Sequence, residues 1–223
     1  MVELIADLQV ERVRANLEDV RAELTRAAEI SGRGVEEVAI LAAGKYVPSV
    51  ELPVLARAGI GLVGENRVQD LQEKVAVHGD LFRWDFIGTL QSKHVRAIVP
   101  HVHLIHSLAS ESALAALERY ADRARSGLEV LVEVNLAGDP SKAGILPEQL
   151  NGFIARSPLP VAGLMTMPPL AHDPEQSRPW FRRLRELAQA HGLKELSMGT
   201  TQDFAVAVQE GATIVRIGTR LYA

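Results

Sequence analysis

The chain has 223 residues, 47% of them hydrophobic, which allows one large domain or two small ones with a sizeable core. Its formal net charge of -4 gives no basic surplus of the kind that binds nucleic acid or anionic membranes, so we expect a small-molecule ligand or a protein partner instead. The absence of cysteine excludes a disulfide framework, a thiolate nucleophile and a cysteine-bound metal, and it suits a reducing compartment.

The amino-terminal residues 1–8 include Glu3 and Asp7 and lack the basic start and apolar core of a secretory signal. No apolar run approaches the roughly 20 residues that a membrane-spanning helix needs. We therefore expect a cytoplasmic protein that has no membrane partner.

An amphipathic helix is predicted over residues 1–30, because Val13, Leu17, Val20 and Leu24 recur at spacings of four and three with charged residues between them. Beyond it, short apolar segments alternate with helical segments that begin at capping residues such as Ser110. The apolar segments, which we predict to be strands, are residues 38–45, 61–66, 83–90, 104–108, 129–135, 161–167, 195–200 and 213–219.

These eight segments begin 18 to 34 residues apart, close to the length of one strand-helix unit, and no change of composition marks a linker. We therefore predict a single α/β domain over residues 1–223, folded as a (β/α)8 TIM barrel, and we expect a monomer. An open doubly wound sheet is the alternative, although no Gly-x-Gly-x-x-Gly follows the first strand. Only four residues follow the last segment, so we expect the amino-terminal helix to cover that side of the barrel.

Lys45 stands where the first buried strand ends, and the small residues Ala42, Ala43 and Gly44 leave room beside it. A lysine in this position is either a side chain that reaches out to solvent or a reactive amine. The free space beside it favours a ligand.

Barrel proteins place their sites at the carboxyl ends of the strands, and phosphate commonly binds to the loops after strands seven and eight. The seventh predicted strand runs into a turn with two threonines, Thr200 and Thr201, and the eighth ends at Gly218-Thr219. Hydroxyls in such loops are more often ordinary helix caps, but two adjacent loops in the expected place favour a phosphate site.

Strand alternation directs Val215 and Ile217 outward, and therefore Arg216 and Gly218 inward. An inward arginine could form a buried ion pair with Glu133. Together with Lys45 and the two loops, it predicts pyridoxal 5'-phosphate, which needs an amine, phosphate donors and a partner for its ring nitrogen.

The motifs along the chain carry a family resemblance. The sequence resembles the pyridoxal phosphate homeostasis proteins, the YggS or PROSC family, whose fold is similar to the fold-type III barrel domain of alanine racemase. The matching motifs are Lys45, Gly64-Glu65-Asn66, Phe86-Ile87-Gly88-x-Leu90-Gln91-Ser92, His106-Ser107, Ser141-Lys142-x-Gly144, Gly163-Leu164-Met165, Leu196-Ser197-Met198-Gly199 and Val215-Arg216-Ile217-Gly218-Thr219.

The resemblance implies a role for each of six residues. Lys45 would form the internal aldimine, and Arg216 would face the pyridine nitrogen. Asn66 would line the pocket, and the phosphate would be held by Ser197, Gly218 and Thr219.

The chain departs from the family pattern at three places. Gly44 stands where serine is usual, Asp85 where we expect histidine, and Lys93-His94 where asparagine-lysine is usual. These departures bear on the first and third strands and their loops.

The resemblance also implies the biological role. The protein would hold pyridoxal phosphate as a lysine Schiff base, without robust catalysis, and would help to control the supply of the cofactor and the balance of amino and keto acids. Enzymes that lack their pyridoxal phosphate would be its protein partners.

Two other functions are open. A racemase needs a second base opposite Lys45, and none of Tyr46, Tyr120 and Tyr222 has an evident reason to lie there. A metal-dependent hydrolase would rest on His101, His103 and His106, but alternation sends His106 to the opposite face from the other two.

Overall fold

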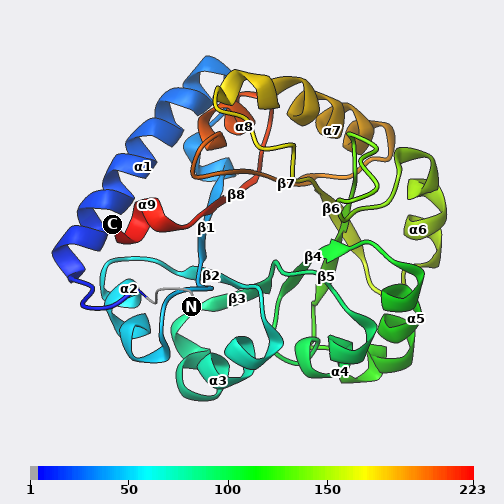
Figure 1. Cartoon of the computed structure of the whole chain (residues 1–223), viewed down its shortest axis with the longest axis horizontal. Helices are drawn as coiled ribbons and strands as arrows, with labels where there is room; N and C mark the ends of the chain where they lie inside the picture. Colours follow the sequence, from blue (N-terminus) through cyan, green and yellow to red (C-terminus); the bar gives the residue numbers. More distant parts are fainter. Residues whose placement is uncertain (1–4) are drawn as a thin grey trace.

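Eight parallel strands form a closed barrel in sequence order in the computed structural model, which describes residues 5–223 (Figure 1). Strand β1 pairs with β2 on one side and with β8 on the other, and the pairing of Ala39 with Ile214 closes the ring. The (β/α)8 barrel is thereby confirmed over the open sheet. The strands are β1 (Ala39–Ala43), β2 (Leu62–Glu65), β3 (Arg83–Phe86), β4 (Leu104–Leu108), β5 (Glu129–Glu133), β6 (Val161–Met165), β7 (Glu195–Thr200) and β8 (Ile214–Ile217).

The helices lie around the outside of the barrel (Figure 1). Ser110 caps α5 as its sequence predicts, because its hydroxyl accepts a hydrogen bond from the Ala113 N–H. The helices are α1 (Val10–Ile30), α2 (Leu52–Arg57), α3 (Val68–His78), α4 (Val95–Ile98), α5 (Glu111–Tyr120), α6 (Leu150–Arg156), α7 (Arg178–Ala190), α8 (Phe204–Gln209) and α9 (Thr219–Tyr222).

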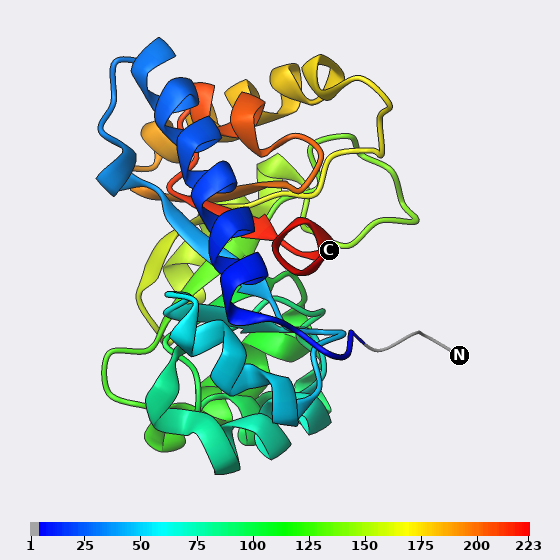
Figure 2. The ribbon, with the colours of Figure 1, turned by 90° about the vertical axis from the view of Figure 1, so that its left-hand side faces the viewer.

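The predicted amino-terminal helix is α1, which begins at Val10 rather than at residue 1. Residues 5–9 are not helical, and residues 1–4 lie outside the described part of the chain. The apolar stripe from Val13 to Leu24 is buried, as its spacing predicts. Helix α1 packs against α8 and α9 and runs across this side of the barrel, which confirms the expected cover beside the short α9 (Figure 2).

Two separate apolar clusters support the barrel. The larger one lies between the strands and the surrounding helices and contains Val215 and Ile217. The smaller one fills the bottom of the barrel interior and is built around Leu41, Leu104 and Ile214. Since side chains alternate along a strand, Arg216 follows Ile214 on the inner face and lies one layer nearer the carboxyl ends.

The described helices include none with the length and apolar character required to cross a membrane. This agrees with the absence of a long apolar run in the sequence.

The packing of α1 can be tested at Leu17, which is 2% exposed. Truncation in Leu17→Ala leaves a cavity between helix and barrel and should lower the free energy of unfolding by about 3 kcal/mol. Ile30, in the last turn of the same helix, is 72% exposed. Ile30→Ala should change the free energy by less than about 0.5 kcal/mol in the same urea titration. Equal losses in the two variants would contradict this account of α1.

Candidate functional site

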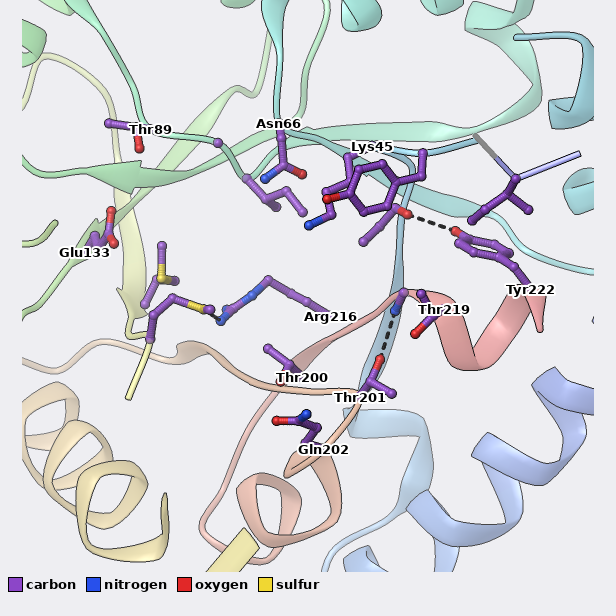
Figure 3. A pocket seen from close by; sticks show the side chains of 18 residues that line it. Lys45, Asn66, Thr89, Glu133, Thr200, Thr201, Gln202, Arg216, Thr219 and Tyr222 are labelled. Carbon is purple, nitrogen blue, oxygen red and sulfur yellow. Dashed lines mark hydrogen bonds between the residues drawn. The ribbon is translucent and has the colours of Figure 1, made fainter. Parts of the chain in front are cut away.

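The carboxyl ends of the strands surround a cavity of about 490 Å3 (Figure 3). Five of the six residues predicted to bind a cofactor line it: Lys45, Asn66, Arg216, Gly218 and Thr219. The sixth, Ser197, does not. This is the end of the barrel at which the strand order predicts a site.

Lys45 lies in the turn that follows β1, and its side chain is exposed. Its ammonium group is 4.4 Å from the ring centre of Tyr46 and forms no ion pair with any residue in the described part of the chain. The backbone that carries it is held from both sides. Tyr222 donates its hydroxyl hydrogen to the Ala43 carbonyl at 3.1 Å, and Lys74 donates to the Gly44 carbonyl at 2.9 Å.

Gly44 lies beside a buried ion pair. Lys74 also pairs with Glu65 at 2.6 Å, and both side chains are buried. A Cβ atom at Gly44 would collide with the Glu65 carboxylate. The serine usual at this position would require the Glu65 carboxylate to shift. Burial raises the pKa of Glu65, and the charge of Lys74 opposes that shift.

The loops after β7 and β8 are joined by a hydrogen bond. Gly199 has a φ of +88°, which turns the chain sharply as β7 ends. The Thr201 hydroxyl then accepts from the Gly218 N–H at 3.2 Å. Thr201 and Thr219 line the cavity, so their hydroxyls can meet a single anionic group. Thr200 also lines it, but its hydroxyl donates to Asp203 Oδ1 at 3.2 Å.

The structure places Ser197 outside the cavity lining, so its predicted phosphate contact stays a prediction. Ser197 points inward, as strand alternation requires, but it is fully buried beneath Arg216. Its hydroxyl contacts Arg216 Nη1 at 2.7 Å and His106 Nδ1 at 2.8 Å. Thr201 has the free access to the cavity that Ser197 lacks. The sequence already indicated Thr201 through its hydroxyl-rich turn, although the motif match favoured Ser197.

Arg216 is 7% exposed and fixed by hydrogen bonds on both sides of its guanidinium group. Nη1 donates to the Ser197 carbonyl at 2.8 Å, and Nη2 donates to the Thr166 carbonyl at 3.1 Å. Burial lowers the pKa of Arg216 to about 10, and the charge of Glu133 opposes the shift. Arg216 is therefore a cation at neutral pH.

The expected ion pair between Arg216 and Glu133 does not form. None of the ion pairs within 4.0 Å in residues 5–223 includes Glu133. Glu133 instead lines the cavity as a buried carboxyl group. Burial raises its pKa, and the positive charge of Arg216 opposes the shift from a distance.

The sequence did not predict every residue of the cavity. Ile5, Tyr46 and Tyr222 all line it, whereas Tyr120 does not. Tyr46 is the direct neighbour of Lys45, and Tyr222 lies three positions after Thr219 in α9, so their positions in the chain could have indicated them. Burial raises the pKa of Tyr222, which keeps its hydroxyl protonated at neutral pH.

His101, His103 and His106, of which only His106 lies in β4, do not form a metal site. In residues 5–223, no group of three His, Cys, Asp or Glu side chains is placed to hold a metal ion. His106 faces the barrel interior and contacts Asp85 and Ser197. The unusual residues Lys93 and His94 lie in a short 3-10 turn, Ser92–His94, outside the cavity lining.

The chain is similar to known proteins along most of its length. The sequence profile of the family described as "Alanine racemase, N-terminal domain" matches residues 9–223. The pyridoxal phosphate homeostasis protein of Aquifex aeolicus is 40% identical over 92% of this chain and 95% of its own. The protein of the same name from Pseudomonas aeruginosa is 36% identical over 94% of each chain.

Solved structures of similar proteins have the same barrel fold. PipY from Synechococcus elongatus with PLP bound superimposes with a TM-score of 0.79 at 30% identity, over 95% of this chain and 100% of PipY. Alanine racemase from Corynebacterium glutamicum superimposes with a TM-score of 0.68 over 100% of this chain and 63% of its own. Its identity is 18%, so this likeness concerns the fold alone.

The buried carboxyl group of Glu133 gives a test by pH. Its pKa is raised in the folded state, so the folded protein binds a proton more tightly there than the unfolded chain does. The wild-type protein should therefore lose stability as pH rises from the ordinary glutamate value through the raised one. Glu133→Gln removes this loss, and its stability relative to wild type should rise over the same window in urea titrations from pH 4 to pH 8.

Glu148 provides the matched control because it is exposed, so Glu148→Gln removes the same charge at the surface. If the stability of Glu133→Gln relative to the wild type stays constant or falls as pH rises, burial in the cavity does not destabilise the ionised carboxylate.

Proposed function

We propose that this chain, which belongs to the family of pyridoxal phosphate homeostasis proteins, binds pyridoxal 5'-phosphate in the cavity at the carboxyl ends of its strands. One observation carries the proposal: the cavity brings an exposed lysine amine together with a fixed arginine and a cluster of hydroxyls. Each matches one functional group of this cofactor.

An unsatisfied polar atom supports the fit. Asn66 Oδ1 is buried and has no hydrogen-bond partner in the described part of the chain, although buried amide oxygens normally have one. Asn66 lines the cavity and points into it (Figure 3). A bound ligand that carries a donor would supply the missing partner.

The residues divide into three groups by what they would hold. Thr201 and Thr219 would hold the phosphate, with Thr201 in place of Ser197, and the Gly218 N–H would orient the Thr201 hydroxyl. Lys45 would supply the amine, and Arg216 would meet the ring nitrogen. Because a guanidinium group has only donors, Arg216 disfavours a proton on that nitrogen.

Bound pyridoxal phosphate would supply an aldehyde, and Lys45 would provide the amine for a Schiff base formed with the loss of one water. Lys45 suits this linkage because its amine makes no ion pair in residues 5–223 and its turn is fixed by Tyr222 and Lys74. The exposed position of Lys45 leaves the linkage open to exchange with another amine. These features support a protein that holds the cofactor reversibly.

A racemase would require a base on each face of the bound ligand. Tyr46 and Tyr222 are the tyrosines of the cavity, and the ring centre of Tyr46 lies 4.4 Å from the Lys45 ammonium group. Tyr222 donates its proton to the Ala43 carbonyl on β1, the strand that leads to Lys45. The arrangement therefore favours carriage over racemisation.

The proposed cellular role follows from reversible binding of the cofactor. We place the protein in the cytoplasm as a single-domain monomer that maintains the supply of pyridoxal phosphate and thereby the balance of amino and keto acids. Its protein partners would be enzymes that require the cofactor. The names of its relatives support this role.

The amine is tested by Lys45→Ala. Wild-type protein incubated with pyridoxal phosphate and then reduced with borohydride should carry the label on the peptide that contains Lys45. Lys45→Ala should lose this label and the visible absorbance of the Schiff base, while weaker binding through the phosphate persists. Lys93→Ala is the control, because Lys93 is exposed and lies outside the cavity. Undiminished labelling of Lys45→Ala would show that another lysine reacts.

The phosphate loops are tested by Thr201→Val. The loss of one hydrogen bond to a charged group costs about 1.5–3 kcal/mol, so the Kd for pyridoxal phosphate should rise roughly 10- to 100-fold. Binding of pyridoxal, which has no phosphate, should hardly change. Thr89→Val is the matched control, because Thr89 lines the cavity away from the two loops (Figure 3). Equal effects on both ligands would remove Thr201 from the phosphate site.

A further inference from the structure

A chain of hydrogen bonds crosses the barrel interior directly beneath the cavity. It starts at Asp85 on β3, whose Oδ2 is 3.2 Å from Nε2 of His106 on β4. His106 Nδ1 is 2.8 Å from the Ser197 hydroxyl on β7. That hydroxyl accepts from Nη1 of Arg216 on β8 at 2.7 Å. All four residues are buried, so the chain is shielded from solvent throughout.

The groups at the two ends fix the direction of every hydrogen bond. A carboxylate only accepts, so the proton between Asp85 and His106 belongs to Nε2. In a neutral imidazole, Nδ1 is then the acceptor, and the Ser197 hydroxyl donates to it. The Ser197 oxygen is left with its lone pairs directed at the Arg216 N–H. The tautomer of His106 follows from this network.

The surroundings of His106 favour the neutral ring. Burial lowers the pKa of His106, and the positive charges of Arg216 and Arg83 lower it further, while Asp85 opposes them. Arg83 is half exposed and lies 3.6 Å from the outer oxygen of Asp85. The ring is therefore a fixed connector between an anion and a cation, rather than a charge of its own.

We propose that Asp85, His106 and Ser197 are positioning residues, which act on a bound ligand only by holding Arg216 in place in the cavity wall. The inference rests on the proposed function, since the ligand in question is pyridoxal phosphate. It gives Asp85 a role on the third strand, where the family pattern has a different residue. It also explains why Ser197 matters to the site without lining it.

A double-mutant cycle tests whether Ser197 acts through Arg216. Ser197→Ala removes one hydrogen bond to a charged group and should raise the Kd for pyridoxal phosphate about tenfold in an absorbance titration. In the Arg216→Met background, Ser197→Ala should have no further effect. A tenfold rise in both backgrounds would show direct contact between Ser197 and the ligand and would overturn the proposal.

Ser177→Ala controls for the loss of a buried hydroxyl. Ser177 is 3% exposed and lies at the end of a 3-10 turn, Pro174–Ser177, away from Arg216. It should leave the Kd unchanged in both backgrounds. A tenfold rise in this variant would mean that Ser197→Ala reports general loosening of the barrel.

A second measurement needs no ligand and is made on the wild-type protein. Nitrogen NMR of the histidine rings in cofactor-free wild-type protein should show His106 neutral, with its proton on Nε2, from pH 8 to below the ordinary histidine pKa of about 6.5. The signal is assigned by its loss in His106→Gln. A proton on Nδ1, or a charged ring at neutral pH, would overturn the network. Failure of the wild-type protein to bind pyridoxal phosphate would instead refute the proposed function and leave this result standing.

Discussion

Arg216 is a cation that β8 directs into the closed interior of a barrel, and the polar layer of the interior is arranged around this charge. A buried guanidinium group is costly unless its N–H groups have acceptors, and here they find Ser197 and the Thr166 carbonyl. The acceptors continue through His106 to the carboxylate of Asp85. Below this layer the interior is apolar, and above it the cavity opens. The cavity therefore begins at the layer where the packing of the barrel interior changes from apolar to polar.

The two cations of the site are treated in opposite ways. Arg216 is immobilised by hydrogen bonds, whereas the amine of Lys45 makes no ion pair in the described part of the chain. The backbone before Lys45 is nevertheless fixed, because Lys74 and Tyr222 occupy the carbonyls of the two preceding residues. A fixed backbone that carries an unpaired amine suits a covalent bond that must form and exchange in one place.

Two departures from the family pattern become intelligible as pairs of residues on different elements. Gly44 leaves the space that the Glu65 carboxylate occupies while it binds Lys74. Asp85 supplies the acceptor that orients His106 on the neighbouring strand. In each case the unusual residue contacts a buried polar partner that lies in another strand or helix. The third departure, Lys93-His94, lies outside the cavity, and nothing in the structure explains it.

The sequence by itself determined the eight strands, their order and the inward direction of Arg216, because burial periodicity and unit length are local properties of the chain. It also indicated Lys45 and the two threonine-containing loops of the cavity, which stand at strand ends and carry distinctive residues. Only the tertiary structure decided the depth of each inward side chain: it moved Ser197 below the cavity, brought Tyr222 into it and separated Glu133 from Arg216. Alternation gives the face of a strand but not the layer, because the layer depends on the relative shift of neighbouring strands around the closed barrel.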